Sequence, residues 1–393
     1  MSALSELLSL PDAEKASRGL THTPAEIAQQ PDTWLSTFEL FRKHQPRIVE
    51  FLSAAGLSAN STSKPAVFLV GAGTSDYVGR AFAELLRKLW RCEVNVVPST
   101  DLLTRADDRM LPPRKSFCIS FSRSGGTAEG VAVLEKLRRS RPDVHHLVIS
   151  CNAESRMIRE NATADNVLAI ALDDAVNDRG LAMTSSFSNM VVFGQCLAHA
   201  ENIDGYRKIL FRLADAGRGL LPQAADCAAA VAKGPFTKAC FVGSGPLRVV
   251  AKESALKVVE LTAGKTFTMS ESALGLRHGP LAALDDRTVF VCFLSGDPRV
   301  QKYEHDLLDD VAKKNLVKCS IVVAGSEGQN SRAEYNLAPP VSIAVDDDYR
   351  PVVDVILGQL LGLFFSMRWN LQPDSPSPNG AITRVVENLK IYG

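Results

Sequence analysis

Two stretches of the chain, 172 residues apart, share one pattern: a short apolar run ends in Gly-x-Gly and leads into an amphipathic helix. The first is Val67–Val70 with Gly71-Ala-Gly73, and the second is Ala239–Val242 with Gly243-Ser-Gly245. Short buried strands that alternate with amphipathic helices are typical of a parallel, doubly wound α/β sheet. We therefore expect one α/β unit and its duplicate, because a pattern that recurs at a long fixed spacing indicates a repeated unit.

Further apolar runs extend this pattern through both halves. Strands are expected at Val67–Val70, Glu93–Val97, Phe117–Phe121, His146–Ile149, Val167–Ala171, Ala239–Val242, Val289–Leu294 and Val317–Val323. Helices are expected at Asp76–Leu89, Thr127–Arg138, Leu247–Leu261, Val300–Lys313 and Val352–Arg368. The predicted organisation is a helical N-terminal segment at 1–50, a first α/β domain at 51–215, a second at 216–372 and a tail at 373–393. Each domain is expected to be a three-layer αβα unit of the flavodoxin-like kind.

The first fifty residues carry helix signals. Thr23 is expected to cap a helix, with Pro24 at its first position and Glu26 completing a capping box. A second helix is expected over Asp32–Phe51, where Pro46 is a potential break. This pattern by itself predicts packing and no chemistry.

Composition excludes several classes of function. The 44 Lys and Arg residues equal the 44 Asp and Glu residues, which argues against a nucleic-acid or membrane-surface binder. The eight cysteines form no CxxC pair and several lie in apolar runs, so we expect buried free thiols, no metal site and a reducing compartment, the cytoplasm. The N-terminus lacks a signal-peptide pattern, and the most apolar stretch, Val355–Met367, is too short to span a bilayer.

The clearest chemical signal is the run Ser120-Phe-Ser-Arg-Ser-Gly-Gly-Thr127. It follows an expected strand and opens an expected helix, where backbone N–H groups and the helix dipole favour an anion. Ser122, Ser124 and Thr127 add hydroxyl donors, and Gly125-Gly126 allows a ligand to approach the backbone. A phosphate monoester suits this lining. The alternative is that these hydroxyls only cap the helix.

A second loop, Gly71-Ala-Gly-Thr-Ser75, occupies the equivalent place one strand earlier, so Gly73, Thr74 and Ser75 could face the same ligand. It is not a dinucleotide fingerprint, because Asp76 stands where the third glycine is required. The counterparts in the second half have lost their hydroxyls, and Asp297 there would repel an anion. One phosphate site per chain is therefore expected.

Candidates for proton transfer lie in the second half. Glu253, Lys257 and Glu260 share one face of an expected helix, and the alternative to a catalytic role is a solvated charged face. His278 stands before Gly-Pro in an irregular polar run. A carboxylate and an imidazole together supply the base and acid of sugar chemistry.

Taken together, these motifs resemble the sugar isomerase (SIS) domain family. They are similar to the paired SIS domains in the isomerase half of glucosamine-6-phosphate synthase, over roughly residues 50 to 393. The nearest group is AgaS, the tagatose-6-phosphate ketose/aldose isomerases or galactosamine-6-phosphate deaminases. Two segments carry that likeness, the run Asp178–Ser186 and the opening Ile27–Trp34.

The resemblance implies roles for individual residues. The sugar 6-phosphate would bind to the two loops, at Gly73, Thr74, Ser75, Ser122, Arg123, Ser124 and Thr127. Glu260 would shuttle a proton between C2 and C1 with Lys257 beside it, and His278 would open the ring and reach into a neighbouring subunit, which implies at least a homodimer. Thr184 and Ser185 would line the sugar hydroxyls. No metal or organic cofactor is required.

The chain departs from the synthase at three places. Ser2 stands where its amidotransferase half begins with cysteine, so no glutamine-fed amide transfer is expected. Arg123 replaces a glutamine of the phosphate loop and could contact phosphate or point to solvent. The C-terminal lysine of the synthase falls near Ile382, and the nearest basic residue is Arg384.

The function expected from this resemblance is conversion of galactosamine 6-phosphate, or a related hexosamine 6-phosphate, to a ketose 6-phosphate and ammonia. One alternative is aldose–ketose isomerisation without deamination. The other is a non-catalytic SIS protein that senses a phosphosugar. Neither a nucleic-acid nor a membrane partner is expected.

Overall fold

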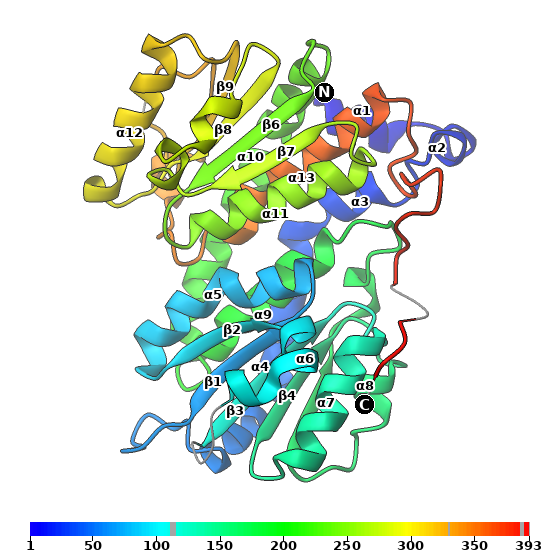
Figure 1. The fold of residues 1–393 in the computed structure, drawn as a ribbon, viewed down its shortest axis with the longest axis vertical. Helices are drawn as coiled ribbons and strands as arrows, with labels where there is room; N and C mark the ends of the chain where they lie inside the picture. The colour runs from blue at the N-terminus through cyan, green and yellow to red at the C-terminus, as the bar shows by residue number, and fades with distance from the viewer. Residues whose placement is uncertain (111–114, 329–330, 386–388, 393) are drawn as a thin grey trace. The chain divides into compact units, whose positions relative to one another are not determined.

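The chain contains two five-stranded parallel sheets with the same strand order (Figure 1). The computed structural model describes residues 1–110, 115–328, 331–385 and 389–392. The first sheet has the order β2-β1-β3-β4-β5, from β1 (Ala66–Gly71), β2 (Val94–Pro98), β3 (Ser116–Ser122), β4 (His145–Ser150) and β5 (Val167–Ala171). The second has the order β7-β6-β8-β9-β10, from β6 (Lys238–Gly243), β7 (Phe267–Glu271), β8 (Thr288–Phe293), β9 (Cys319–Val323) and β10 (Tyr335–Leu337). Both are the flavodoxin-like order, which confirms the predicted fold class and the duplication.

The register of the strands fixes the equivalence of the two halves. Gly71 is the last residue of β1 and Gly243 the last of β6, and each of these strands is paired on both sides and lies next to an edge strand of its sheet. Ala66 of β1 pairs with Ser116 of β3, and Lys238 of β6 pairs with Thr288 of β8. Both members of the second pair lie 172 residues after their counterparts in the first pair, so the register is repeated at the same spacing.

The residues form two compact units, and each contains one sheet. The first-sheet unit comprises residues 33–177, 185–208 and 384–393, and the second-sheet unit comprises 1–32, 178–184 and 209–383. This grouping differs from the predicted linear boundaries, because the N-terminal segment and the tail are each divided between the units. Long-range packing determines the grouping, whereas the predicted boundaries follow chain order.

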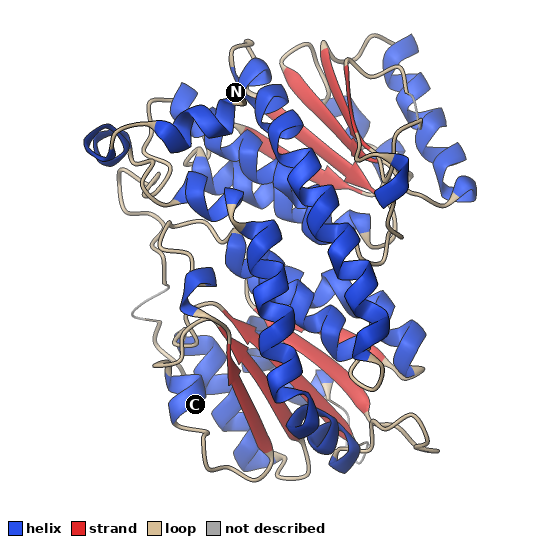
Figure 2. Cartoon of the chain, turned by 180° about the vertical axis from the view of Figure 1, so that it is seen from behind, coloured by secondary structure: helices blue, strands red, loops and turns tan. Residues whose placement is uncertain are grey.

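In the first-sheet unit, helices lie on both faces of the sheet (Figures 1 and 2). On one face, α6 (Ser99–Arg109) and α7 (Ala128–Ser140) pack on the strands through an apolar cluster that includes Phe68, Cys118 and Leu137. On the other, α5 (Thr74–Trp90) approaches Leu69 through Gly79, and α9 (Ser185–Ala198) packs on α5. The short helix α8 (Arg156–Arg159) follows β4.

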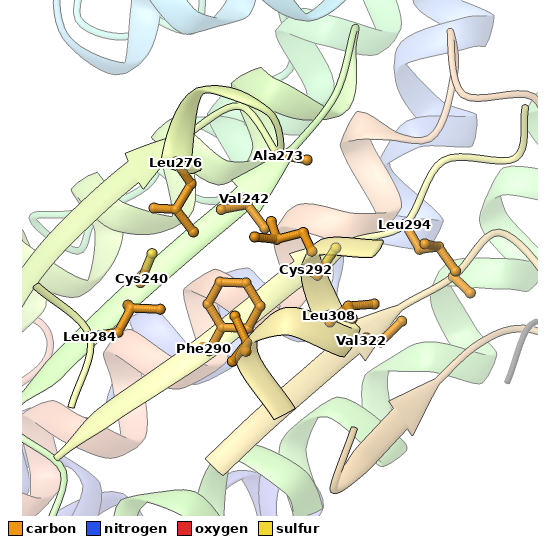
Figure 3. Close-up of a cluster of buried hydrophobic side chains, with 13 residues drawn as sticks. Cys240, Val242, Ala273, Leu276, Leu284, Phe290, Cys292, Leu294, Leu308 and Val322 are labelled. Atoms are coloured by element: carbon orange, nitrogen blue, oxygen red, sulfur yellow. The ribbon is translucent and has the colours of Figure 1, made fainter. Parts of the chain in front are cut away.

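In the second-sheet unit, α12 (Pro298–Lys313) covers one face of the sheet through the buried cluster of Figure 3, in which Phe290, Cys292 and Leu308 are in contact. On the other side, α11 (Leu247–Leu261) packs against α13 (Pro351–Arg368). Two glycines of α13 allow this close approach: a Cβ at Gly358 would lie 2.2 Å from Ser254 Oγ, and one at Gly362 would lie 3.0 Å from the Lys257 carbonyl oxygen.

Helix α13 has the length and composition of a membrane-spanning helix, and it is longer than the apolar stretch noted in the sequence. However, 89% of it is buried inside the protein, as in the core helix of a soluble protein. All eight cysteines are free thiols and only Cys92 is not fully buried, which confirms the expectation of buried free thiols.

The remaining helices are α1 (Ala3–Ser9), α2 (Asp12–Arg18), α3 (Thr23–Ala28), α4 (Gln30–Ala54) and α10 (Ile203–Ala232), with the short 3-10 turns η1 (Asp174–Val176), η2 (Gly275–Arg277), η3 (Pro280–Ala283) and η4 (Val341–Ile343). Pro46 does not break α4, because Phe41 and Ile48 on either side are fully buried and hold the helix together. The helices α6, α9 and α10 and the strand β7 were not expected. Ser270 and Glu271 therefore lie in a strand rather than in an irregular run.

The predicted capping box at the start of α3 is wrong. The N-cap position is His22, and the Thr23 hydroxyl donates to the carboxylate of Asp374 (2.8 Å). Glu26 accepts hydrogen bonds from the backbone of residues 179 and 180 instead of folding back on its own helix. A partner that is distant in sequence has replaced the local one.

Candidate active site

The loop between β1 and α5 has the shape that its two glycines require. A Cβ at Gly71 would lie 2.3 Å from the Ser75 carbonyl oxygen, and Gly73 has a φ of 55°. The second-sheet unit repeats both features, because a Cβ at Gly243 would lie 2.4 Å from the Leu247 carbonyl oxygen and Gly245 has a φ of 53°. Nothing lies within 4 Å of a Cβ built on Gly73, so glycine is needed there for its backbone conformation.

The loop between β3 and α7 presents hydroxyl groups as the sequence predicted. Ser122 Oγ accepts the N–H of Gly125 (3.0 Å), and Ser124 Oγ accepts the N–H of Gly126 (3.3 Å). Each hydroxyl that accepts in this way keeps its own proton for donation. Thr127 is the N-cap residue of α7, but its side chain makes no capping bond. The alternative, that these hydroxyls only cap the helix, therefore does not describe Thr127.

The carbonyl groups of this loop are bonded to the segment that follows β4. The Arg123 carbonyl accepts the N–H of Cys151 (3.2 Å), and the Gly125 carbonyl accepts the N–H of Met157 (3.1 Å). Gly125 has a φ of 56°, and a Cβ there would lie 2.3 Å from Ser155 Oγ. Backbone conformation and space both require glycine at this position, and the loop is held in one shape before any ligand binds.

Arg123 does not point to solvent. Its guanidinium donates to the carbonyl of Arg384 in the C-terminal segment, and the Arg384 guanidinium donates to Asn177 Oδ1 (2.8 Å). Both contacts lie within the first-sheet unit. Arg123 and Arg384 therefore link the phosphate loop to the end of the chain.

The four remaining hydroxyls of the predicted site are buried. Thr74 and Ser75 begin α5 and retain 4% and 7% exposure. Thr184 and Ser185 are fully buried; the Thr184 hydroxyl donates to Asp178 (3.1 Å), and Ser185 Oγ accepts from Asn189 Nδ2 (3.3 Å). Their role at the sugar stays a prediction.

In the second-sheet unit, α11 carries a buried group of three charges. Lys257 is fully buried; its Nζ lies 2.5 Å from Glu260 Oε2 and 3.4 Å from Glu253 Oε1. Glu253 is fully buried as well, whereas the Glu260 side chain keeps 23% exposure. The alternative of a solvated charged face is wrong, because the side chains of Glu253 and Lys257 are fully buried.

The electrostatics of this group favour a permanent ammonium. Burial acts to lower the pKa of Lys257, but the charges of Glu253 and Glu260 outweigh it and raise the pKa above its usual value. The ammonium holds one carboxylate oxygen of Glu260 in place. Of the two carboxylates that contact Lys257, Glu260 is the one that solvent can reach.

His278 follows η2 and is exposed. The turn before it is anchored by an ion pair between Arg277 and Asp310, and the next residue, Gly279, has a φ of 118°. His278 lies in the same unit as Glu260, whereas the phosphate loops lie in the other unit.

In the second-sheet unit, the loop that follows β8 is the counterpart of the phosphate loop, and carboxylates bind its polar groups. Asp347 accepts from Ser295 Oγ (2.6 Å) and from the N–H of Gly296 (2.9 Å), and Glu304 accepts from the N–H of Ser295 (2.8 Å). Asp297, which was expected to repel an anion, instead accepts the N–H of Arg299 at the start of α12 (2.8 Å). The expectation of one phosphate site keeps its support, but the carboxylates responsible are different ones.

Sequence reasoning missed Asp347, Glu304 and the part that Glu253 takes in holding Lys257. The first two lie 52 and 9 residues from the loop atoms that they bind, so no local motif marks them. Glu253 was visible as a third charge on the face of α11, and only its burial shows that it contributes.

Comparison with known proteins agrees with this geometry. The SIS domain family matches residues 62–200. An AgaS protein of Streptomyces coelicolor is 34% identical over 374 residues, which cover 94% of this chain and 95% of that protein. The chain belongs to the AgaS family of SIS-domain proteins. An Escherichia coli AgaS, described as a D-galactosamine-6-phosphate deaminase, is 32% identical over 95% of this chain and 96% of its own length.

Solved structures give the same family. The tagatose-6-phosphate ketose/aldose isomerase of Escherichia coli has a TM-score of 0.84 at 29% identity and covers 94% of this chain and 96% of its own. A structure from Clostridium novyi has a TM-score of 0.90 at 26% identity, with 98% of both chains covered. The C-terminal domain of the Francisella tularensis glucosamine-fructose-6-phosphate aminotransferase, at 20% identity and a TM-score of 0.70, shares the fold.

Proposed function

We propose that this AgaS protein is an amino-sugar-phosphate deaminase with aldose–ketose isomerase chemistry, acting on galactosamine 6-phosphate or a related hexosamine 6-phosphate. The observation that carries the proposal is the buried Lys257 ammonium, 2.5 Å from the carboxylate of Glu260. The ammonium fixes the position of the Glu260 carboxylate, which is partly exposed to solvent. A general base that removes a proton from carbon needs such a fixed and accessible position. The relatives described as deaminases supply the substrate class.

The phosphate would be held by the loop at Ser122, Ser124 and Thr127 and by the loop at Gly73, Thr74 and Ser75. Support comes from hydroxyl protons that remain available and from the preformed backbone of both loops. Arg123 contributes through its contact with the C-terminal segment. Binding energy from the phosphate, which is remote from the reacting carbons, would offset part of the cost of orienting the sugar.

The proposed deamination starts from the open-chain form of the amino sugar. After ring opening, assisted by His278, Glu260 takes the proton from C2 of the open aldehyde. The electron pair of the C2–H bond forms the C1–C2 double bond of an enolamine, while the C1–O π bond breaks and O1 takes up a proton. Return of a proton to C1, with loss of a proton from the nitrogen, gives a C2 imine. Water adds to C2, the C–N bond breaks, and ammonia leaves with the ketose 6-phosphate, so one water is consumed per ammonia released.

The experiment is a substrate panel of galactosamine, glucosamine and fructosamine 6-phosphates, with ammonia and ketose measured in parallel. Glu260→Gln should lower turnover by about 10²–10⁴-fold and leave phosphosugar affinity nearly unchanged. Glu39→Gln is the control, because Glu39 also pairs with a cation three residues away, Arg42, but both of these side chains are exposed. Full activity in Glu260→Gln would refute the assignment of the base.

Isomerisation without deamination is the second candidate, because the 29% identical Escherichia coli structure is described as a ketose/aldose isomerase. It predicts interconversion of tagatose 6-phosphate and its aldose, with no ammonia from any member of the panel. Binding of a phosphosugar without turnover would instead indicate a sensor.

The proposal includes a homodimer in which His278 serves the partner's site. The exposure of His278 at the end of an anchored turn supports it. Mixing His278→Ala with Glu260→Gln should restore about a quarter of the wild-type sites, because each mixed dimer then has one intact site. No recovery on mixing would contradict sharing. A cytoplasmic location fits the eight free cysteines.

A further inference from the structure

The segment 178–184 of the second-sheet unit, which carries Thr184, is bound by parts of the chain that lie far away in sequence. Glu26 on α3 accepts the backbone N–H of Arg179 (2.5 Å) and of Gly180 (3.2 Å). A Cβ at Gly180 would lie 2.8 Å from Thr23 Oγ1 and 3.0 Å from Glu26 Oε2. The backbone of the segment is thus in direct contact with α3.

Asp374 binds α3 and the segment at the same time. Its carboxylate accepts the N–H groups of Thr21, His22 and Thr23 at 2.7 to 3.0 Å, which are backbone donors at the start of α3. Its carbonyl accepts the N–H of Leu181 (3.0 Å). Asp374 therefore fixes α3, and α3 presents Glu26 to the segment.

The segment also closes on itself. The Asp178 carboxylate accepts both the N–H (2.8 Å) and the hydroxyl (3.1 Å) of Thr184. Asp178 and Thr184 are both buried, so the two ends of the segment are joined away from solvent. Arg179 and Gly180, whose N–H groups Glu26 binds, thus belong to the same closed turn as Thr184.

Glu26 differs from an ordinary structural carboxylate in its charge environment. Burial raises its pKa to about 7, the nearby carboxylates of Asp178 and Asp374 add to the rise, and the two backbone donors act against it. The side chain of Arg179 is exposed. Glu26 therefore changes its charge within the neutral pH range.

We propose that Glu26 is a positioning residue of the sugar site: through the N–H groups of Arg179 and Gly180 it holds segment 178–184, and so sets the place of Thr184 toward the sugar. The inference rests on the proposed function, because Thr184 is assigned to the sugar there. It gives the N-terminal helix α3, a packing element by its sequence, a share in substrate recognition.

The first test separates sugar recognition from phosphate recognition. Glu26→Ala should weaken binding of galactosamine 6-phosphate tenfold or more and leave the affinity for inorganic phosphate unchanged, because the phosphate loops belong to the other unit. It should also speed hydrogen exchange at Gly180 and Leu181. Glu14→Gln on α2, an exposed carboxylate paired with Arg18, is the control.

The second test uses the charge of Glu26. Glu26→Gln keeps a carbonyl acceptor and cannot ionise, so it should match the wild type in KM at pH 6, where Glu26 is mainly protonated. At pH 8 the KM of Glu26→Gln should differ from that of the wild type, because Glu26 is then ionised and lies near the carboxylates of Asp178 and Asp374. A KM ratio that is the same at both pH values would overturn the proposal.

The outcomes distinguish this inference from the proposed function. Faster exchange in Glu26→Ala with unchanged sugar affinity and unchanged KM would leave Glu26 a purely structural residue and refute the positioning role. Wild-type protein that binds galactosamine 6-phosphate but releases no ammonia would refute the deaminase and leave the binding test of Glu26 intact. Equal loss of phosphosugar and inorganic phosphate affinity would also count against the proposal.

Discussion

Replacing Lys257 by methionine tests whether the three charges of α11 form a buried unit. Methionine has a similar length and carries no charge. The change removes the ammonium, whose Nζ lies 2.5 Å from a Glu260 carboxylate oxygen and 3.4 Å from a Glu253 carboxylate oxygen. The fully buried carboxylate of Glu253 then loses this cation.

Removing one partner of a buried ion pair costs about 3–5 kcal/mol. For a chain of this length, with an unfolding entropy of about 2 cal/mol/K per residue, the melting temperature should fall by roughly 4–6 °C. Turnover should fall as well, because Glu260 loses the group that holds it.

Thermal unfolding at pH 7.5 measures the loss of stability, and a turnover assay measures the effect on Glu260. The double variant Glu253→Gln/Lys257→Met is the matched control, because it removes the buried cation together with the buried anion and should recover most of the stability. A fall in unfolding free energy of less than about 1 kcal/mol at pH 7.5, the size expected of an exposed pair, would refute the reasoning.

Three further predictions follow from single contacts. Gly125→Ala should raise the KM for phosphosugar about tenfold or more and lower the stability by about 1–3 kcal/mol, because the new Cβ would meet Ser155 and the backbone has a positive φ. Gly126→Ala, where a Cβ would be 3.8 Å from its nearest protein neighbour, should leave the melting temperature nearly unchanged. Asp374→Ala removes an acceptor from three backbone N–H groups, so denaturant unfolding should show a loss of about 1–3 kcal/mol. Burial raises the pKa of Glu26 to about 7, from an unfolded-state value near 4.5. The stability that comes from protonating Glu26 is therefore fully present below pH 4.5 and is lost as the pH rises through 7. Between pH 5 and pH 8, Glu26→Gln should thus gain stability relative to the wild type in urea titrations.

Much of the fold was predictable because its signals are local. The strand β5 and the helix α11 begin and end at the predicted residues, since a run of apolar residues or a helical periodicity needs no information from elsewhere in the chain. The glycines after β1 and β6 were predictable for the same reason. Helix α9 was not, because it is buried on all sides and has no polar face to reveal its period.

The candidate site divides in the same way. The hydroxyls of Ser122, Ser124 and Thr127 stand in one loop, so their spacing was enough to predict their grouping. The capping box at Thr23 and Glu26 was wrong because Asp374, 351 residues away, supplies the acceptor. A local rule cannot anticipate a competitor that only the folded chain brings near.

The charges show where the limit lies. That Glu253, Lys257 and Glu260 share a helix face follows from their spacing, but only the folded chain shows that Glu253 and Lys257 are fully buried. In the second-sheet unit, a carboxylate was expected near the loop after β8, yet Asp347 reaches it from the segment before α13. Residue order determined the strands, the turns and the duplicated plan, because those depend on neighbours within a few positions. Burial, charge environment and the partners of each polar atom were determined by the packed fold, because they depend on which distant segments exclude water from a group.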